Sequence, residues 1–199
     1  MENPLISVII PTYNAEDTVG RTIRSVEDAP DVEIIVVNDG STDNSQEAIL
    51  DALFEKDCHT VYAKQENKGV AGAVNKGLDL ARGKYVVLLG SDDWLLEGFD
   101  KFRELMKGDA DLIFFDLEVN DGSVWNITDD NDQLYVGSVK FMRREFVGED
   151  RDPLGVQFAE DRELYEKLLK KNPKKVFTGV VLKHYNFPRE GSLCWVHNH

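Results

Sequence analysis

The sequence has little of what disulfide-rich, membrane-spanning and secreted proteins are built from. It contains two cysteines, Cys58 and Cys194, too far apart for a CxxC pair, so neither a disulfide framework nor a zinc site is indicated. Its longest apolar runs, LISVII and YVVLL, fall far short of the roughly 20 residues of a membrane-spanning helix. The N-terminus lacks the basic and then apolar layout of a signal peptide. We therefore expect a soluble, cytoplasmic protein without a transmembrane segment.

Positive charge is also scarce, with 23 Lys and Arg residues against 37 Asp and Glu residues and a net charge of −14. Because nucleic-acid phosphates are normally bound by a Lys/Arg face, a nucleic-acid partner is disfavoured. The remaining composition, 42% hydrophobic and 30% charged over 199 residues, is typical of a globular chain of one-domain size. We expect a single domain over residues 1–199.

The first half of the sequence alternates apolar, β-rich runs with amphipathic helical patterns, which predicts an α/β fold with a mostly parallel sheet flanked by helices. After about residue 118 the pattern becomes less regular, so we expect residues 119–199 to form a smaller, irregular half. Strands are predicted at 5–10, 33–38, 60–64, 84–89, 111–118 and 176–183. Helices are predicted around Val19–Val26 and Ala48–Leu53 and at 70–81, 99–107 and 160–171.

Polar residues follow three of these strands, in the segments PTYN (11–14), NDGSTD (38–43) and GSDD (90–93). In open α/β sheets, ligands bind beyond the carboxyl ends of the strands. The Asp39 carboxylate could accept a hydrogen bond from a nucleobase N–H group, and Tyr13 could supply a stacking face. The same residue types also suit a turn followed by a helix cap, so both interpretations stay open.

The adjacent carboxylates of Asp92 and Asp93 predict a cation, because two such charges at the end of an apolar strand repel unless something positive lies beside them. Mg²⁺ and Mn²⁺ typically bind one or two carboxylates together with substrate phosphates. The alternative is a solvated loop that caps the following turn.

A strong helical pattern, AEDRELYEKLLKK, places Asp161 in its first turn. Acidic residues there complement the helix dipole without any further role. The functional alternative is that Asp161 faces the cleft as a general base.

Taken in order, the segments SVIIPTYN, EIIVVNDGSTDNS, NKGVAGAVNKGLDLARGKYVVLLGSDDWL, AEDRELYEKLL and REGSL resemble the motif succession of the family 2 inverting glycosyltransferases with the GT-A fold. The resemblance covers nearly the whole chain. It implies a nucleotide-sugar-binding half over residues 1–118 and an acceptor and catalytic-base half over residues 119–199.

The resemblance implies transfer of a sugar from a nucleoside-diphosphate sugar, with a UDP-sugar favoured, to a hydroxyl group of a carbohydrate or glycoconjugate acceptor. In this family pattern Asp161 is the catalytic base and Asp93 coordinates Mn²⁺ or Mg²⁺. The implied donor-binding residues are Pro11, Thr12, Tyr13, Asp39, Asn67, Asp92 and Arg189.

Three positions depart from the family pattern. Gly90 stands where many members have an acidic residue, and Val74 stands where an arginine often precedes the second asparagine. Arg189 stands where many members carry a histidine metal ligand, and its fork of donors could contact the diphosphate directly.

Two other function classes remain as alternatives. One is a nucleotide-sugar-binding interaction domain without turnover, which these departures make conceivable. The other is a sugar nucleotidyltransferase, which would need a Gly-rich, basic phosphate loop that PTYNAEDT lacks. For a transferase, we place acceptor recognition in the segment 120–155, whose aromatic residues are Trp125, Tyr135 and Phe141.

Overall fold

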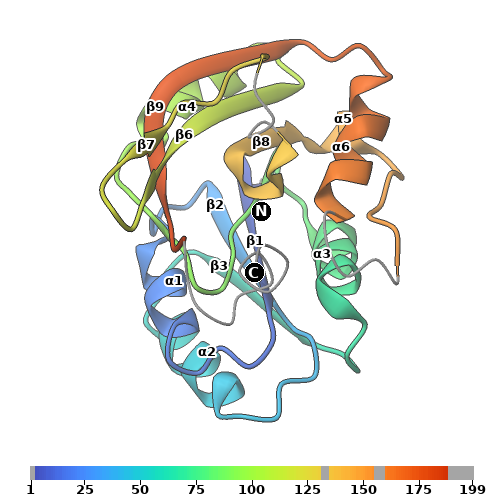
Figure 1. Ribbon diagram of the computed structural model, residues 1–199. Coiled ribbons are helices and arrows are strands. Elements are labelled where there is room, and N and C mark those ends of the chain that lie inside the picture. Colours follow the sequence, from blue (N-terminus) through green and yellow to red (C-terminus); the bar gives the residue numbers. More distant parts are fainter. Residues whose placement is uncertain (1–2, 131–134, 155–159, 188–199) are drawn as a thin grey trace.

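The computed structural model describes residues 3–130, 135–154 and 160–187, which form one mixed sheet with helices packed on it (Figure 1). The strands run in the order β3-β2-β1-β4-β8-β6-β9-β5, and β7 pairs with β6. Their bounds are β1 Ile6–Thr12, β2 Val32–Asn38, β3 His59–Lys64, β4 Tyr85–Leu88, β5 Trp94–Leu95, β6 Leu112–Val119, β7 Val124–Trp125, β8 Lys140–Arg143 and β9 Lys175–Tyr185.

Helices lie on both sides of the strands of the first half. In Figure 1, α1 and α2 lie to one side of β1, β2 and β3, and α3 lies to the other. The helices are α1 Val19–Ser25, α2 Ser45–Phe54, α3 Gly69–Leu80, α4 Phe99–Met106, α5 Arg144–Val147 and α6 Glu160–Leu169, with a 3₁₀ turn, η2, at Gly137–Val139.

The strands β3, β2, β1 and β4 are mutually parallel, as the apolar runs of the first half predict. The chain moves outward from β1 through β2 to β3 and then returns to place β4 on the other side of β1. The direction of winding therefore reverses between β1 and β4. Crevices at such a reversal, beyond the carboxyl ends of the strands, are where α/β sheets bind ligands.

Beyond β4 the sheet becomes mixed and curls. β8 pairs antiparallel with both β4 and β6, while β9 runs parallel to β6 and antiparallel to β5. Strand β5 is at the far end of the strand order, yet residues 89–93 alone separate it from β4 in sequence. The curl thus brings β9 of the second half against the loop that follows β4.

The α/β fold class and the six predicted strands are confirmed, with boundaries shifted by up to two residues. Three short strands were not among those predicted: β5 in the first half, and β7 and β8, which bring the second half into the sheet. The sequence of β8, KFMR, carries charges at both ends, and its Lys140 is nevertheless buried. Phe141 is fully buried in the core, so its predicted part in acceptor recognition is wrong.

Of the two cysteines, the structure describes Cys58. Cys58 is a buried free thiol, and its burial, together with nearby Asp28, raises the thiol pKa to about 11. Cys194 lies outside the described residues.

Close packing of α3 on β1 depends on Gly77. A Cβ atom at this position would lie 2.2 Å from Cγ2 of Ile9. We expect Gly77→Ala to lower the free energy of unfolding by about 1–3 kcal/mol, because overpacking forces the helix off the sheet. Urea denaturation measures this change, and Lys76→Ala, at an exposed position of the same helix, should change it by less than about 0.5 kcal/mol. Equal effects of the two variants would contradict this packing argument.

Candidate functional site

The carboxyl ends of the first three strands are held side by side by their backbone. Thr12 pairs with Asn38, and Asn38 pairs with Lys64 in the sheet register. The hydrogen bonds continue past the strand ends, from Asp39 N to the carbonyl oxygen of Thr12 at 2.8 Å and from Gln65 N to that of Asn38 at 3.0 Å. Sequence-predicted residues from three loops are therefore brought to one edge of the sheet.

Asp39 is buried here with one carboxylate oxygen already occupied. Its Oδ1 accepts hydrogen bonds from Gln65 Nε2 at 2.7 Å and from the Lys68 backbone N–H at 3.0 Å. No residue within the described ranges bonds to Oδ2. The carboxylate is thus fixed in orientation while retaining capacity to accept one more donor.

Other predicted donor-binding residues surround Asp39. Pro11 and Thr12 form the end of β1, where the buried Thr12 hydroxyl donates to its own strand at Ile10 O. Tyr13, which follows, is 51% exposed and offers an open ring face. Asn67 lies exposed before α3, and its Oδ1 accepts the Gly69 N–H at 3.2 Å.

Gly40 permits a close approach between the two loops. Its φ is +75°, and a Cβ atom there would lie 2.9 Å from the Asn67 backbone nitrogen. A side chain at this position would be strained and would push Asn67 away from Asp39.

The loop after β4 carries Asp92 and Asp93, and the structure gives Asp93 two protein partners. Lys183 Nζ lies 2.7 Å from Asp93 Oδ2, and the Asn186 backbone N–H donates to Oδ1 at 2.9 Å. Both side chains of this ion pair are almost completely buried, and Lys183 also donates to Ser138 Oγ in η2. Asp93 is therefore neutralised and oriented by the second half of the chain.

Helix α1 holds the backbone of the same loop. The buried Thr22 hydroxyl lies 2.9 Å from the carbonyl oxygen of Ser91 and 2.7 Å from that of Asp93, and can donate to either. Arg21 Nη2 donates to the carbonyl oxygen of Asp92 at 3.0 Å. These contacts fix the backbone of the loop at Asp92, whose side chain is half-buried.

The carboxylates of Asp92 and Asp93 converge over Gly90. A Cβ atom on Gly90 would lie 2.9 Å from Asp93 Oδ2 and 3.2 Å from Asp92 Oδ1. Within the described ranges there is no group of three His, Cys, Asp or Glu residues that could hold a metal ion. The arrangement fits a cation that takes one carboxylate from the protein and its remaining ligands from a diphosphate and water.

His184 does not extend this carboxylate group. Its ring stacks on Trp94 with 3.8 Å between centroids, and its nitrogens lie 3.1 Å from Glu118 Oε1 and 3.0 Å from Asn120 Oδ1. Both ring nitrogens already face protein oxygens, which is the arrangement of a structural histidine.

Helix α6 is confirmed, and Asp161 lies in its first turn, although its side chain falls outside the described residues, as does Arg189. The segment before α6 is tied to α3 by a pair of 2.9 Å hydrogen bonds between the Asn75 amide and the backbone of Asp152. Lys171 of the turn that follows α6 pairs with Asp150. These bonds fix α6 against the half that carries Asp39.

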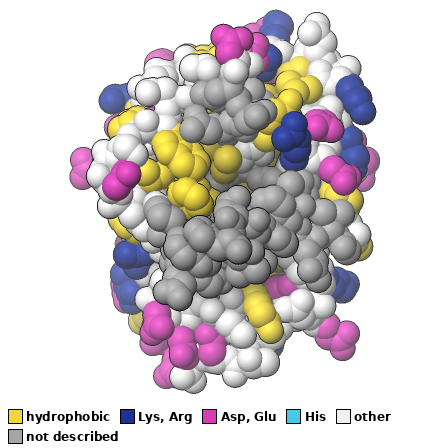
Figure 2. All heavy atoms as spheres, in the orientation of Figure 1, with side chains coloured by type: hydrophobic (Ala, Val, Ile, Leu, Met, Phe, Trp, Pro, Cys, Tyr) yellow, Lys and Arg dark blue, Asp and Glu magenta, His cyan; other side chains and the backbone are white. Residues whose placement is uncertain are grey.

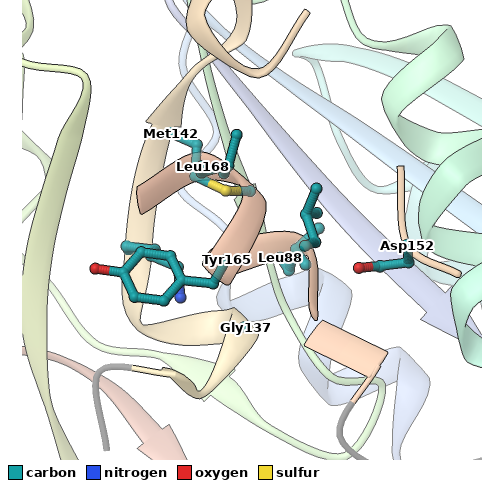
Figure 3. Close-up of a pocket in the computed structure, with 8 residues that line it drawn as sticks. Leu88, Gly137, Met142, Asp152, Tyr165 and Leu168 are labelled. Carbon is teal, nitrogen blue, oxygen red and sulfur yellow. The ribbon is translucent and has the colours of Figure 1, made fainter. Parts of the chain in front are cut away.

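Two hollows in the surface do not coincide with this site. The first, about 10 Å³, lies among Leu88, Met142, Leu168 and their neighbours (Figure 3), and is at the lower limit of space for one water molecule. In Figure 3 the Tyr165 hydroxyl points away from Asp152. The second, about 440 Å³, is an open depression along α2. Neither is lined by Asp39 or the Asp92–Asp93 pair.

Sequence reasoning missed the residues that hold the site together, namely Arg21, Thr22, Ser138, Lys183 and Asn186. Two of them leave a signal. Lys183 is a lone charge inside the apolar run VVLKHY, and Thr22 is a polar residue on the apolar face of α1. Such positions indicate a buried polar partner elsewhere in the chain.

Comparison with known proteins identifies a family over most of the chain. The family model described as glycosyl transferase family 2 matches residues 7–169. Glycosyltransferase GlyA of Streptococcus pneumoniae is 37% identical over 111 residues, which are 54% of this chain and 16% of GlyA. Glycosyltransferase GlyG of the same organism is 34% identical over 129 residues, which are 61% of this chain and 42% of GlyG. The matched parts are thus less than half of these relatives.

Solved structures show the same fold. TarS of S. aureus in complex with UDP-GlcNAc superposes with a TM-score of 0.78 at 21% identity, covering 94% of this chain and 59% of TarS. The mannosyltransferase PcManGT from Pyrobaculum calidifontis, in complex with GDP-Man and Mn²⁺, gives a TM-score of 0.75 at 20% identity over 98% of this chain and 60% of that one. The predicted GT-A fold is confirmed. None of the described helices combines the length and apolar content that a bilayer crossing requires.

The buried Lys183–Asp93 pair yields a stability prediction. Lys183→Met should lower the free energy of unfolding by about 3–5 kcal/mol, because it leaves the Asp93 carboxylate buried without its counter-charge. Adding Asp93→Asn to this variant should recover a large part of the loss. Chemical denaturation of the single and double variants measures both, and an additive double variant would contradict direct pairing.

Proposed function

The chain belongs to glycosyl transferase family 2, and we propose that it transfers a sugar from a nucleoside-diphosphate sugar to a hydroxyl group of a glycan or glycoconjugate. The observation that carries this proposal is the oriented Asp39 carboxylate, with Oδ1 engaged by the protein and Tyr13 exposed beside it. This pair suits a nucleobase, whose N–H group would bond to Oδ2 while its ring stacks on Tyr13.

A uridine diphosphate donor is our preferred assignment. TarS is complexed with UDP-GlcNAc and PcManGT with GDP-Man, so the fold accommodates more than one base. The remaining predicted donor residues, Pro11, Thr12 and Asn67, line the approach to Asp39 from β1 and from the loop before α3.

We place the divalent metal, Mn²⁺ or Mg²⁺, at Asp92 rather than at Asp93, which the sequence favoured. Coordination by Asp93 would compete with the ammonium group of Lys183 at 2.7 Å. Asp92 is half-buried at the loop surface, Arg21 holds its backbone carbonyl, and the lack of a side chain on Gly90 leaves room for its carboxylate. When bound, such a cation supplies positive charge against the diphosphate as it leaves. The Mn²⁺ in the PcManGT complex supports this proposal.

In the proposed mechanism Asp161, at the start of α6, accepts the proton of the acceptor hydroxyl. The acceptor oxygen attacks C1 of the donor sugar as the bond from C1 to the nucleoside diphosphate breaks, so the product has inverted configuration. The ties from Asn75 and Lys171 to the segment 150–152 hold α6 in place against α3. These contacts would orient the catalytic base, Asp161, relative to the donor.

Donor binding tests the first part of the proposal. We expect calorimetry to detect one nucleoside diphosphate among UDP, GDP and dTDP, with tighter binding in Mn²⁺ than in chelator. Asp39→Asn should weaken this binding about 10- to 100-fold, since it removes a charge-assisted hydrogen bond. Asp92→Asn should abolish the metal dependence.

Asp100→Asn, at a carboxylate whose side chain is 94% exposed on α4, is the matched control and should bind like the wild type. Absence of binding to all three nucleotides would overturn the donor site. Binding without transfer to any acceptor would favour a nucleotide-sugar-binding domain, and pyrophosphate release from a nucleoside triphosphate would favour a nucleotidyltransferase.

The role of Asp161 is tested by separating binding from turnover. Asp161→Asn should leave the donor Kd unchanged and lower kcat by about 10²- to 10⁴-fold, since it removes the base alone. Hydrolysis of the bound sugar nucleotide or transfer to an acceptor panel measures kcat. Glu163→Gln, at an exposed position of the same helix, should retain activity. An Asp161→Asn variant with normal kcat would rule out this base.

A further inference from the structure

Three aromatic side chains meet beside the Asp93 loop. Trp125 of β7 lies 5.8 Å from Tyr185, the last residue of β9, and 5.4 Å from Phe187, measured between ring centroids. The rings of Tyr185 and Phe187 are parallel within 5°, and Trp125 meets them at 67° and 62°. We call this arrangement the aromatic corner, because the Tyr185 and Phe187 rings stack on each other and the indole meets this stack at an angle.

The aromatic corner is continuous with the site. Alternation along β9 places Lys183 and Tyr185 on the same face of the strand. Lys183 Nζ lies 4.9 Å from the Tyr185 ring centroid and 2.7 Å from Asp93 Oδ2. Asn186 lies between Tyr185 and Phe187 in the sequence, and its backbone N–H donates to Asp93 Oδ1. Lys183, Tyr185 and Asn186 therefore hold the aromatic corner next to the Asp93 carboxylate.

These rings are not core residues. Phe102, Phe114, Phe115 and Phe141 are fully buried, whereas Trp125, Tyr185 and Phe187 each stay partly exposed. Figure 2 shows hydrophobic side chains gathered on the upper left of the visible face, where β6, β7 and β9 lie in Figure 1. Of the aromatic residues predicted to recognise an acceptor, Tyr135 instead packs on Tyr165 and under Arg162.

We propose that the aromatic corner binds a neutral pyranose ring of the acceptor, a proposal that rests on the glycosyltransferase function proposed above. The C–H face of a pyranose packs on aromatic rings, and rings that meet at an angle contact that face and one ring edge together. A neutral ring is favoured because Lys183 is already paired with Asp93 and the chain carries a net charge of −14. Trp125 and Tyr185 belong to β7 and β9 of the second half, whereas Asp39 follows β2 of the first half, so different halves of the chain bind the acceptor and the donor nucleotide.

Saturation-transfer NMR tests this directly. The probes are the methyl glycosides of glucose, galactose, mannose, N-acetylglucosamine and glucuronic acid, each with the protein, diamagnetic Mg²⁺ and the nucleoside diphosphate that binds. We expect at least one neutral glycoside to receive saturation on the protons of its C–H face, and the glucuronide to receive less. Trp125→Ala should lower this signal at least fivefold, and Trp125→Phe should retain an intermediate signal.

Phe54→Ala, at an aromatic residue that is 91% exposed on α2, is the matched control and should give the wild-type signal. Nucleotide calorimetry on every variant reports folding and the donor site independently. Should Trp125→Ala fail to fold, Trp125→Phe and Phe187→Ala carry the test. Nucleotide binding with no saturation of any neutral glycoside, or with an undiminished signal in the Trp125 variants, would overturn the aromatic corner. Loss of nucleotide binding in the wild type would instead count against the proposed function.

Discussion

The buried pair of Lys183 and Asp93 is the contact on which the arrangement of the site depends. It joins the loop after β4 to β9, and the same ammonium group reaches Ser138 in η2. Burying two charges is costly, and a pair of well-packed apolar residues would be at least as stable in many proteins. What the pair adds is specificity, because a carboxylate, an ammonium group and the Asn186 N–H fit together in one register of β9 against the loop.

That register sets the balance of charge at the Asp92–Asp93 loop. With Asp93 neutralised, the converging carboxylates over Gly90 act as a single net negative charge and not as two. One charge shared with a diphosphate is within the range that Mg²⁺ and Mn²⁺ sites use. Thr22 and Arg21 complete the arrangement from the other side by holding carbonyl oxygens of the same loop, so both halves of the molecule determine where Asp92 lies.

The parallel half of the fold could be predicted because its signal is local. β1, β2 and β4 are mostly apolar, with Ser7 in β1 and Glu33 in β2 as polar exceptions, and the polar residues that follow each strand reach one edge by the rules of parallel sheets. The assignment of roles within the Asp92–Asp93 pair had no such local signal. The partner of Asp93 is 90 residues away in sequence, and a lysine in an apolar strand indicates a buried partner without saying which one.

On the acceptor side, too, the sequence could not predict which residues lie together in the fold. Composition drew attention to Trp125, Tyr135 and Phe141 as one group, but the curled sheet separates them, with Phe141 in the core and Tyr135 against α6. The contacts of Trp125 are with Tyr185, the last residue of β9, and Phe187 just beyond it, two residues that the sequence analysis did not single out. Because β9 carries both Lys183 and the aromatic corner, a change in the register of this one strand would move the carboxylate of the donor site and the aromatic rings together. Donor geometry and acceptor recognition are therefore coupled through the backbone of β9.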